Sequence, residues 1–179
     1  MKTLYLLRHA KSSWTDPTLE DHERTLNERG RRTAPLMGAY MREHGYVPDY
    51  VLCSSARRTL ETLELLRPSL EPGTPVDVDP GIYHVPAPTM MRVVRRLPPA
   101  SDRALIIGHN PGLEDLIEML ARPDGTRAEL EAREKLAAGF PTAGFAVLRA
   151  DVSAWDEVMP QACQLVCVVK PKELADLDD

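Results

Sequence analysis

The chain has 179 residues, of which 43% are hydrophobic and 27% are charged, and its formal net charge is −5. This length and composition predict one globular domain with a single core. The acidic balance argues against a nucleic-acid partner, so any anion that the protein binds must be attracted by a local cluster of positive charge. The sequence has neither an apolar run of roughly 18 residues nor a signal-peptide pattern, so we expect a cytoplasmic protein without a membrane partner.

Apolar runs of strand type recur along the chain, and helical patterns separate most of them. This alternation predicts an α/β fold: a single three-layer domain with a mainly parallel sheet flanked by helices on both faces. The domain is expected to span residues 1–171, with a flexible acidic tail over 172–179. The expected strands are 3–7, 50–53, a weaker one at 76–78, 104–107, 143–148 and 164–169, and the expected helices are 25–45, 57–66, 89–97, 113–121 and 128–138.

The first helical region has two local signals. Thr25-Leu26-Asn27-Glu28 is a capping-box pattern that opens the helix. Pro35 falls inside the region, and proline removes a backbone donor and crowds the preceding turn. We therefore expect a kink there, or a short turn followed by a new helix.

Cationic and imidazole groups follow three of the expected strands. The first strand ends in Arg8 and His9, the second runs into Ser-Ser-Ala-Arg-Arg at 54–58, and the third is followed by His109. The two serines are expected to cap the helix that follows the second strand. Ligands of open parallel sheets bind beyond the carboxyl ends of the strands, where neighbouring strands lie ~4.8 Å apart. The sequence therefore predicts an anion site at this edge of the sheet.

The segments "LLRHA", "SSARRTLET" and "IIGHNPG", in this order, resemble the histidine phosphatase superfamily, also called the phosphoglycerate mutase-like family. The opening "LRHAKSSW…DHERTLNERG" is closer to its small branch, the SixA-type phosphohistidine phosphatases. The resemblance runs from residue 3 to about 148. It implies an enzyme that hydrolyses phosphoric monoesters or phosphoramidates with no metal and no other cofactor.

The family's site residues carry over onto matching positions. His9 matches the nucleophile that becomes phosphorylated, and Arg8 matches the neighbouring phosphate-binding arginine. The Arg-x-x-x-Thr motif places the second phosphate-binding arginine at Arg58, so that the adjacent Arg57 faces outward. His109 matches the second catalytic histidine of the pocket.

One position departs from the family pattern. Larger relatives have a glutamate that protonates the leaving group, and His84 stands at the corresponding place here. Either His84 supplies the proton, or another residue such as Asp21 does, or the substrate needs little protonation. Phosphohistidine has a weak P–N bond and a competent leaving group, whereas an alkoxide must be protonated as it departs.

The connections between the expected strands are short, and residues 122–142 are the largest candidate for a cover over the site. An open pocket favours phosphohistidine on a protein partner, and a small phosphate ester is the alternative substrate. A metal site built from His9, His22, His84 and His109 together with cysteines lacks a recognisable ligand spacing such as CxxC or HExxH. A non-catalytic phosphate-binding module is disfavoured because binding alone needs no nucleophile. By default we expect a monomer.

Overall fold

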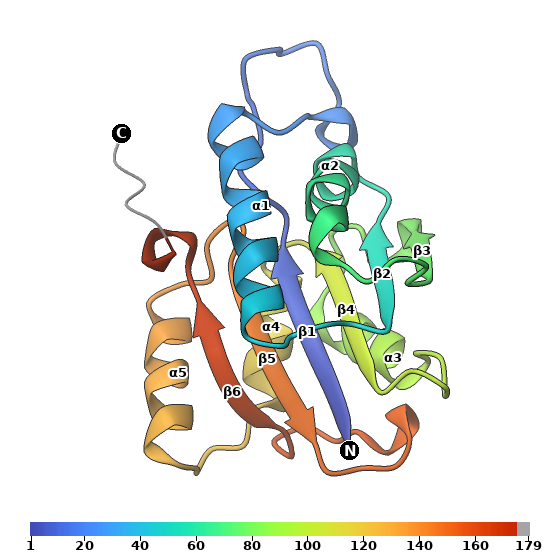
Figure 1. The fold of residues 1–179 in the computed structure, drawn as a ribbon, viewed down its shortest axis with the longest axis vertical. Coiled ribbons are helices and arrows are strands. Elements are labelled where there is room, and N and C mark those ends of the chain that lie inside the picture. Colours follow the sequence, from blue (N-terminus) through green and yellow to red (C-terminus); the bar gives the residue numbers. More distant parts are fainter. Residues whose placement is uncertain (175–179) are drawn as a thin grey trace.

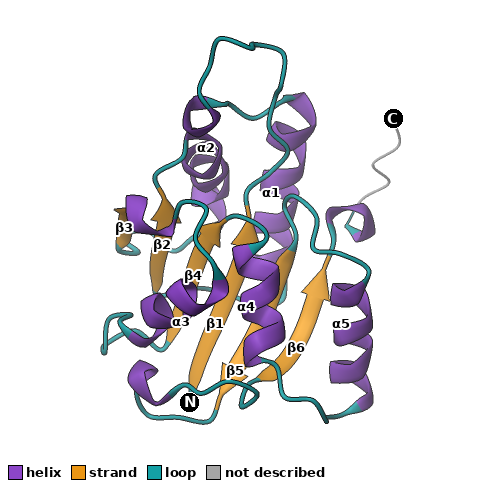
Figure 2. Ribbon diagram, turned by 180° about the vertical axis from the view of Figure 1, so that it is seen from behind, coloured by secondary structure: helices purple, strands orange, loops and turns teal. Residues whose placement is uncertain are grey.

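A six-stranded mixed sheet forms the middle layer of the fold, in a computed structural model that describes residues 1–174 (Figures 1 and 2). The strand order is β3-β2-β4-β1-β5-β6. The first four strands in this order pair in parallel, and β5 is antiparallel to both of its neighbours, β1 and β6. The predicted α/β three-layer domain with a mainly parallel sheet is confirmed. The strands are β1 (Lys2–Arg8), β2 (Tyr50–Ser54), β3 (Val76–Asp79), β4 (Arg103–Gly108), β5 (Phe145–Ala150) and β6 (Gln164–Val169).

Helices cover both faces of the sheet. In Figure 1, α1 (Glu28–Glu43) and α2 (Arg57–Leu66) lie in front of the strands, while α3 (Ala87–Arg95) and α4 (Gly112–Leu120) lie behind them. The fifth helix, α5 (Arg127–Ala137), packs along β6 at the edge of the sheet. All five helical regions that the sequence predicts are present.

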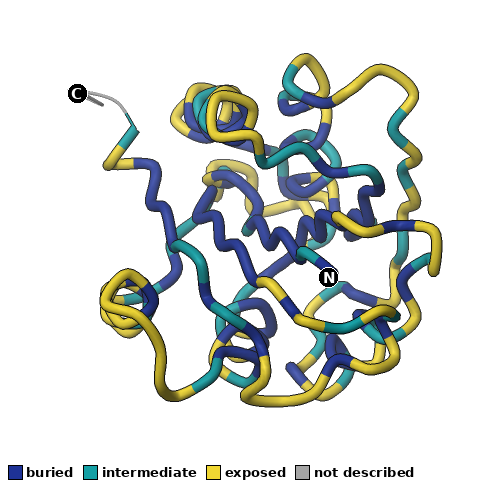
Figure 3. Tube along the Cα trace, turned by 60° about the horizontal axis from the view of Figure 1, so that its bottom comes forward, coloured by how far each residue is buried: buried dark blue, intermediate teal, exposed yellow. Residues whose placement is uncertain are grey.

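The central strand β1 is buried on both faces, which explains why its apolar run is continuous. Leu4 and Leu6 belong to the core under α3 and α4, whereas Tyr5 and Leu7 belong to the core under α1 and α2. Side chains alternate between the two faces of a strand, so a strand that is covered on both faces is apolar at every position. Figure 3 shows the strands as the buried interior of the molecule.

Two predicted helix caps are wrong, and the prediction at Pro35 is wrong in part. The N-cap of α1 is Asn27, whose side chain accepts a hydrogen bond from the backbone N–H of Gly30, and not Thr25. The same helix runs through Pro35 without interruption, so the short turn followed by a new helix is excluded, while the kink stays a prediction. The N-cap of α2 is Ala56, so the two preceding serines do not cap this helix.

The strand β5 starts two residues later than predicted. Ala143 has a positive φ of 57°, which takes the chain out of extended geometry immediately before the strand. Its backbone N–H donates to the carbonyl oxygens of Arg8 and His9, at 3.1 and 3.0 Å. The turn before β5 is therefore bonded to the end of β1.

The longest excursion from the sheet is the segment 9–27, which the sequence pattern does not predict. It projects beyond α1 and α2 in Figure 1 and contains the short 3-10 turn Asp21–Glu23. The expected cover, residues 122–142, is mostly α5 and belongs to the layered fold. Of the predicted tail 172–179, the first two residues belong to the 3-10 turn Pro171–Glu173, and 175–179 lie outside the described residues. Within residues 1–174, no helix is long and apolar enough to cross a membrane.

Candidate active site

The pairing of β1 with β4 brings the first and third motifs together. Arg8 and Gly108 are partners in the parallel register, and the backbone N–H of His9 donates to the Gly108 carbonyl at 3.1 Å. The next residue on each strand is a histidine, and the imidazole rings of His9 and His109 have centroids 5.3 Å apart. Both rings lie at the carboxyl ends of their strands, as the sequence predicts.

His9 is a buried, oriented imidazole, with 6% of its surface exposed. Its Nδ1 lies 2.7 Å from the carbonyl oxygen of Ala10, which can only accept, so Nδ1 carries the proton and Nε2 is unprotonated, with a lone pair that accepts a long hydrogen bond from Nε of Arg58. Burial lowers the pKa of His9 to about 3, and the positive charges of Arg58 and Arg8 add to this effect, although the bond to Ala10 opposes it. The ring is therefore neutral at physiological pH.

His109 is held by a serine for which the sequence predicts a different contact. Its Nε2 lies 2.7 Å from the hydroxyl oxygen of Ser54, at the end of β2. Burial and the neighbouring His9 and Arg58 lower the pKa of His109 to about 2. Its Nδ1 is buried and has no hydrogen-bond partner among the described residues.

Arg58 is the more deeply buried of the two candidate phosphate-binding arginines, with 1% of its surface exposed. Its Nε lies 3.4 Å from Nε2 of His9. Its two other nitrogens donate to Asp21, one to the carbonyl oxygen at 2.7 Å and one to the carboxylate at 3.0 Å. Arg57, by contrast, is exposed and pairs with Glu61 at 3.6 Å, so the register assigned to this motif agrees with the geometry.

Arg8 directly precedes His9 in the chain and is half-buried. One of its terminal nitrogens donates to the carbonyl oxygen of Phe140 at 3.0 Å. Its Nε is buried and has no partner among the described residues. Burial lowers its pKa, but an arginine side chain stays charged throughout the physiological range. The contact with Phe140 could not be predicted, because nothing in that segment resembles a site motif.

Asp21 connects the projecting segment to the site. One of its carboxylate oxygens accepts hydrogen bonds from Arg58 and from the hydroxyl of Tyr83, and the other accepts from Arg24 at 3.1 Å. Burial raises the pKa of this carboxyl group, but the hydrogen bonds from Tyr83 and His84 and the charge of Arg58 outweigh it and hold the pKa far below its usual value. Asp21 is therefore ionised at neutral pH. Tyr83 is not among the predicted site residues, although it directly precedes His84.

His84 lies within the site, with its ring centroid 4.8 Å from that of His109. Its Nε2 is 3.0 Å from both the Asp21 carboxylate and a terminal nitrogen of Arg58. A proton on Nε2 would be donated to Asp21, whereas a bare Nε2 would accept from Arg58, so one contact excludes the other at any moment. His84 also has a positive φ of 48°.

The position of His84 depends on a glycine in the third motif. At Gly112, a β-carbon would lie 2.3 Å from the carbonyl oxygen of Val85, which is too close for any other residue. This contact packs the start of α4 against the residue that follows His84. Because Gly112 has no side chain, the loop that carries His84 can lie directly against the loop that carries His109.

The alternative metal site is not assembled. His22 turns to Glu23 and to the hydroxyl of Ser55, at 3.0 and 2.9 Å. Across residues 1–174, no group of three or more histidine, cysteine, aspartate or glutamate side chains is arranged to hold a metal ion. The arrangement instead presents two arginines and two neutral imidazoles around one small space, which suits a phosphoryl dianion.

Comparison with known proteins agrees with this chemistry. The sequence profile of the histidine phosphatase superfamily (branch 1) matches residues 4–136. The uncharacterized protein Rv1276c of Mycobacterium tuberculosis is 34% identical over 160 residues, which cover 89% of this chain and 96% of that protein. The chain belongs to the histidine phosphatase superfamily.

Solved structures indicate the branch. The SixA protein of Nakamurella multipartitia aligns with a TM-score of 0.79 and 28% identity, covering 95% of this chain and 96% of that one. The SixA protein of Agrobacterium tumefaciens aligns with a TM-score of 0.76 and 27% identity, covering 95% and 98%. Both are described provisionally as phosphohistidine phosphatases. The chain is a phosphatase of the SixA-type branch.

Proposed function

We propose that this phosphatase hydrolyses phosphohistidine on a protein partner, through a phosphoryl group carried transiently by His9. The observation that carries the proposal is the ionised state of Asp21, one of the candidate general acids, whose carboxyl group is held deprotonated by Arg58 and Tyr83. An ionised carboxylate has no proton to give. The site therefore suits substrates whose leaving group needs little protonation.

The first step is attack by Nε2 of His9 on phosphorus. The bond from Nδ1 to Ala10 fixes the reactive tautomer, and the lowered pKa keeps the lone pair available. The P–N bond of the substrate breaks as the new bond forms. The departing imidazole leaves as a neutral ring when its other nitrogen has taken a proton from solvent, so the enzyme need not supply one.

In this proposal, Arg8, Arg58 and His109 stabilise the negative charge on the transferring phosphoryl group. The unpartnered Nε of Arg8 and the unpartnered Nδ1 of His109 are directed to the oxygens in this scheme, while the Ser54 hydroxyl donates to Nε2 of His109. Such preorganised donors stabilise the transition state without reorganisation. In the second step water attacks phosphorus, the electron pair returns to Nε2 of His9, and both water protons leave with the released phosphate.

A small-molecule phosphomonoesterase is the second candidate function. The observation that favours it is His84, whose side chain is 43% exposed and whose ring lies beside His109. A protonated imidazole at this place could donate to a departing alkoxide. This role would extend the substrate range to sugar phosphates and similar esters.

The two candidates are separated by a panel of substrates. We expect kcat/KM for a phosphohistidine protein or peptide to exceed that for alkyl phosphate esters by at least about a hundredfold, the lower end of what a general acid contributes. Nitrophenyl phosphate, which has a good leaving group, should fall between them. Equal or faster turnover of alkyl esters would favour the second candidate. The assays are run with and without a chelator, and the proposed charge neutralisation by arginine predicts no difference.

A further inference from the structure

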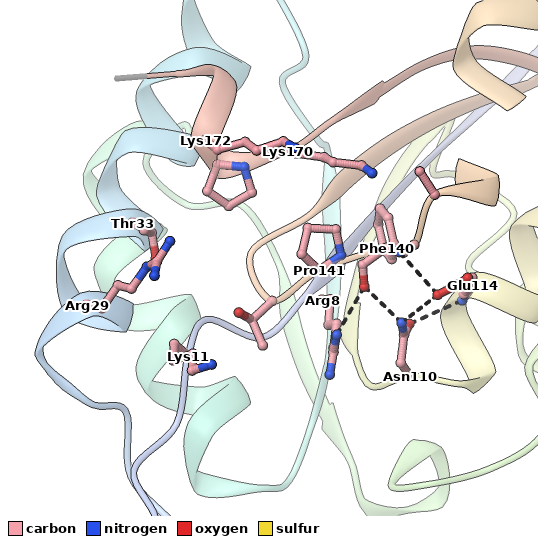
Figure 4. A pocket seen from close by; sticks show the side chains of 14 residues that line it. Arg8, Lys11, Arg29, Thr33, Asn110, Glu114, Phe140, Pro141, Lys170 and Lys172 are labelled. Atoms are coloured by element: carbon pink, nitrogen blue, oxygen red, sulfur yellow. Dashed lines mark hydrogen bonds between the residues drawn. The ribbon is translucent and has the colours of Figure 1, made fainter. Parts of the chain in front are cut away.

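A pocket of positive charge opens beside the site, on the side of Arg8. Its volume is about 530 Å³, and Figure 4 shows its lining. We call it the basic pocket and define it by its cationic side chains, which come from β1 and the segment after it, from α1 and from the chain that follows β6. They are Arg8, Lys11, Arg29, Lys170 and Lys172.

The near wall of the basic pocket is fixed by a close backbone contact. At Gly30, a β-carbon would lie 2.2 Å from the carbonyl oxygen of Lys11, and the Asn27 backbone N–H donates to that same oxygen at 2.9 Å. Only glycine permits this approach. The first turn of α1, which carries Arg29, is thereby held against the residue two positions after His9.

Within the described residues, the cations of the basic pocket have few carboxylates close to them. Within residues 1–174, none of the five takes part in an ion pair. The one carboxylate in the lining, Glu114, accepts hydrogen bonds from Asn110 and from the backbone N–H of Phe140, at 2.9 and 3.2 Å. Lys170 is only 8% exposed, and its charge helps to lower the pKa of Glu173, which itself pairs with Lys135 at 2.6 Å.

This concentration of charge stands out in a chain with a net charge of −5. Unpaired like charges around one cavity repel each other, and they also raise the local concentration of anions. The basic pocket shares Arg8 with the site of phosphoryl transfer, so an anion bound there lies next to the phosphoryl group on His9. The two sites therefore suit two anionic groups of the same substrate.

The arrangement favours an acidic stretch of a protein over one compact anion. In Figure 4, Lys11 and Arg29 lie to the left of Arg8, on the other side of the pocket, and Pro141 lies above Arg8. Donors for a single small anion converge on one point, whereas these are spread. Lys11, Arg29 and Lys172 are exposed, so a macromolecular surface can reach them.

We propose that the basic pocket binds carboxylate side chains that flank the phosphohistidine of the partner protein. This inference rests on the proposed function and adds a preference to it: acidic residues near the phosphohistidine speed capture of the substrate. Charge complementarity of this kind acts mainly on association and on specificity, and added salt weakens it.

The first test compares two phosphohistidine peptides of equal length, one with glutamates and one with glutamines beside the phosphohistidine. For the unaltered enzyme at low salt, kcat/KM should be about tenfold higher for the acidic peptide, which corresponds to about 1.4 kcal/mol. The difference should lie in KM. Turnover of neither peptide would contradict the proposed function itself, whereas equal turnover of both would contradict only the basic pocket.

The second test removes charge from the exposed part of the pocket. In the triple variant Lys11→Gln, Arg29→Gln, Lys172→Gln, the ratio of kcat/KM for the acidic peptide to kcat/KM for the glutamine peptide should fall to within about twofold of unity. A residual preference of this size corresponds to the few tenths of a kcal/mol expected for exposed ion pairs. A matched variant, Arg92→Gln, Arg96→Gln, Arg149→Gln, removes three exposed charges away from the pocket and should keep the ratio. Thermal unfolding of both variants checks the fold.

Three results would overturn the proposal. One is an unchanged ratio in the pocket variant. Another is an equal loss in the matched variant, which would mean that net charge alone is responsible. The third is that the unaltered enzyme prefers small esters with two phosphates to those with one, and that the pocket variant loses this preference while its kcat/KM ratio for the two peptides does not change. That result would assign the pocket to a small molecule.

Discussion

Arg58 and Asp21 join the projecting segment to the active site through two hydrogen bonds, with a terminal nitrogen of Arg58 3.0 Å from the carboxylate of Asp21 and the other 2.7 Å from its carbonyl oxygen. The arginine is almost fully buried, and the carboxylate that pairs with it is 43% exposed. We therefore expect a positioning role for Asp21, which holds the guanidinium that faces His9.

The variant Asp21→Asn tests this positioning role. Losing the charge that holds Arg58 should lower kcat/KM by about tenfold or more, and by the same factor for alkyl and nitrophenyl phosphates. A general acid would behave differently, because its loss harms poor leaving groups selectively. Steady-state kinetics on both esters decides between these roles, with Glu20→Gln, an exposed neighbouring carboxylate, as the control.

His84 is tested by the same comparison of leaving groups. We expect His84→Ala to leave phosphohistidine hydrolysis within about tenfold of the unaltered enzyme, because this substrate needs little help from an acid. Alkyl esters should be slow even with the native residue. Rapid alkyl ester turnover that survives His84→Ala would show that another group is the acid, and the small-molecule function would then be preferred.

The two adjacent arginines of the second motif should differ sharply. Arg58→Ala should cost on the order of 3 kcal/mol in transition-state stabilisation, about a hundredfold in rate, whereas Arg57→Ala should have a small effect. Arg58→Lys keeps the charge but loses the planar fork, and should also be impaired. The measurement is kcat/KM for nitrophenyl phosphate. Equal damage from both alanine variants would contradict the assigned roles.

The sequence was sufficient for the fold and for the meeting of the three strand-end motifs. Parallel strands align their carboxyl ends, so Arg8, His9 and His109 had to lie at one edge once their strands were recognised. The sequence was insufficient where a contact joins distant segments through tertiary packing. Ser54 has the local pattern of a helix cap and instead bonds His109.

The projecting segment shows the same limit. Residues 9–27 have no periodic pattern, so their course could not be predicted, and Asp21 was only one of several candidates. The basic pocket was equally hidden, because Lys11, Arg29 and Lys170 are far apart in sequence and each alone has the pattern of a solvated charge. The sequence predicted only that an acidic chain that binds an anion must contain a local cluster of positive charge, and it did not predict where the basic pocket lies.

Burial of His9 should make the protein sensitive to acid. Its pKa is lowered from 6.5 to about 3 in the folded state, chiefly by burial. Between these values the unfolded chain binds more protons than the folded one, so the free energy of unfolding falls as the pH falls. His9→Gln should therefore lose less stability than the unaltered protein between pH 7 and about pH 4.5, by on the order of 2.5 kcal/mol.

Urea unfolding at the two pH values measures this effect. The variant His44→Gln replaces an exposed histidine and should keep the pH dependence of the unaltered protein. An identical pH dependence in His9→Gln and the unaltered protein would mean that His9 is not held neutral by its surroundings.

The central claim is that His9 carries the phosphoryl group during turnover, and trapping that group tests it most directly. The enzyme is mixed briefly with labelled substrate, quenched in alkali and digested, and the phosphorylated peptide is sequenced by mass spectrometry. We predict an alkali-stable, acid-labile phosphoryl group on the peptide that contains His9, with neither adduct nor turnover in His9→Ala. Substantial turnover by His9→Ala, or a phosphoryl group on any other residue, would contradict this claim.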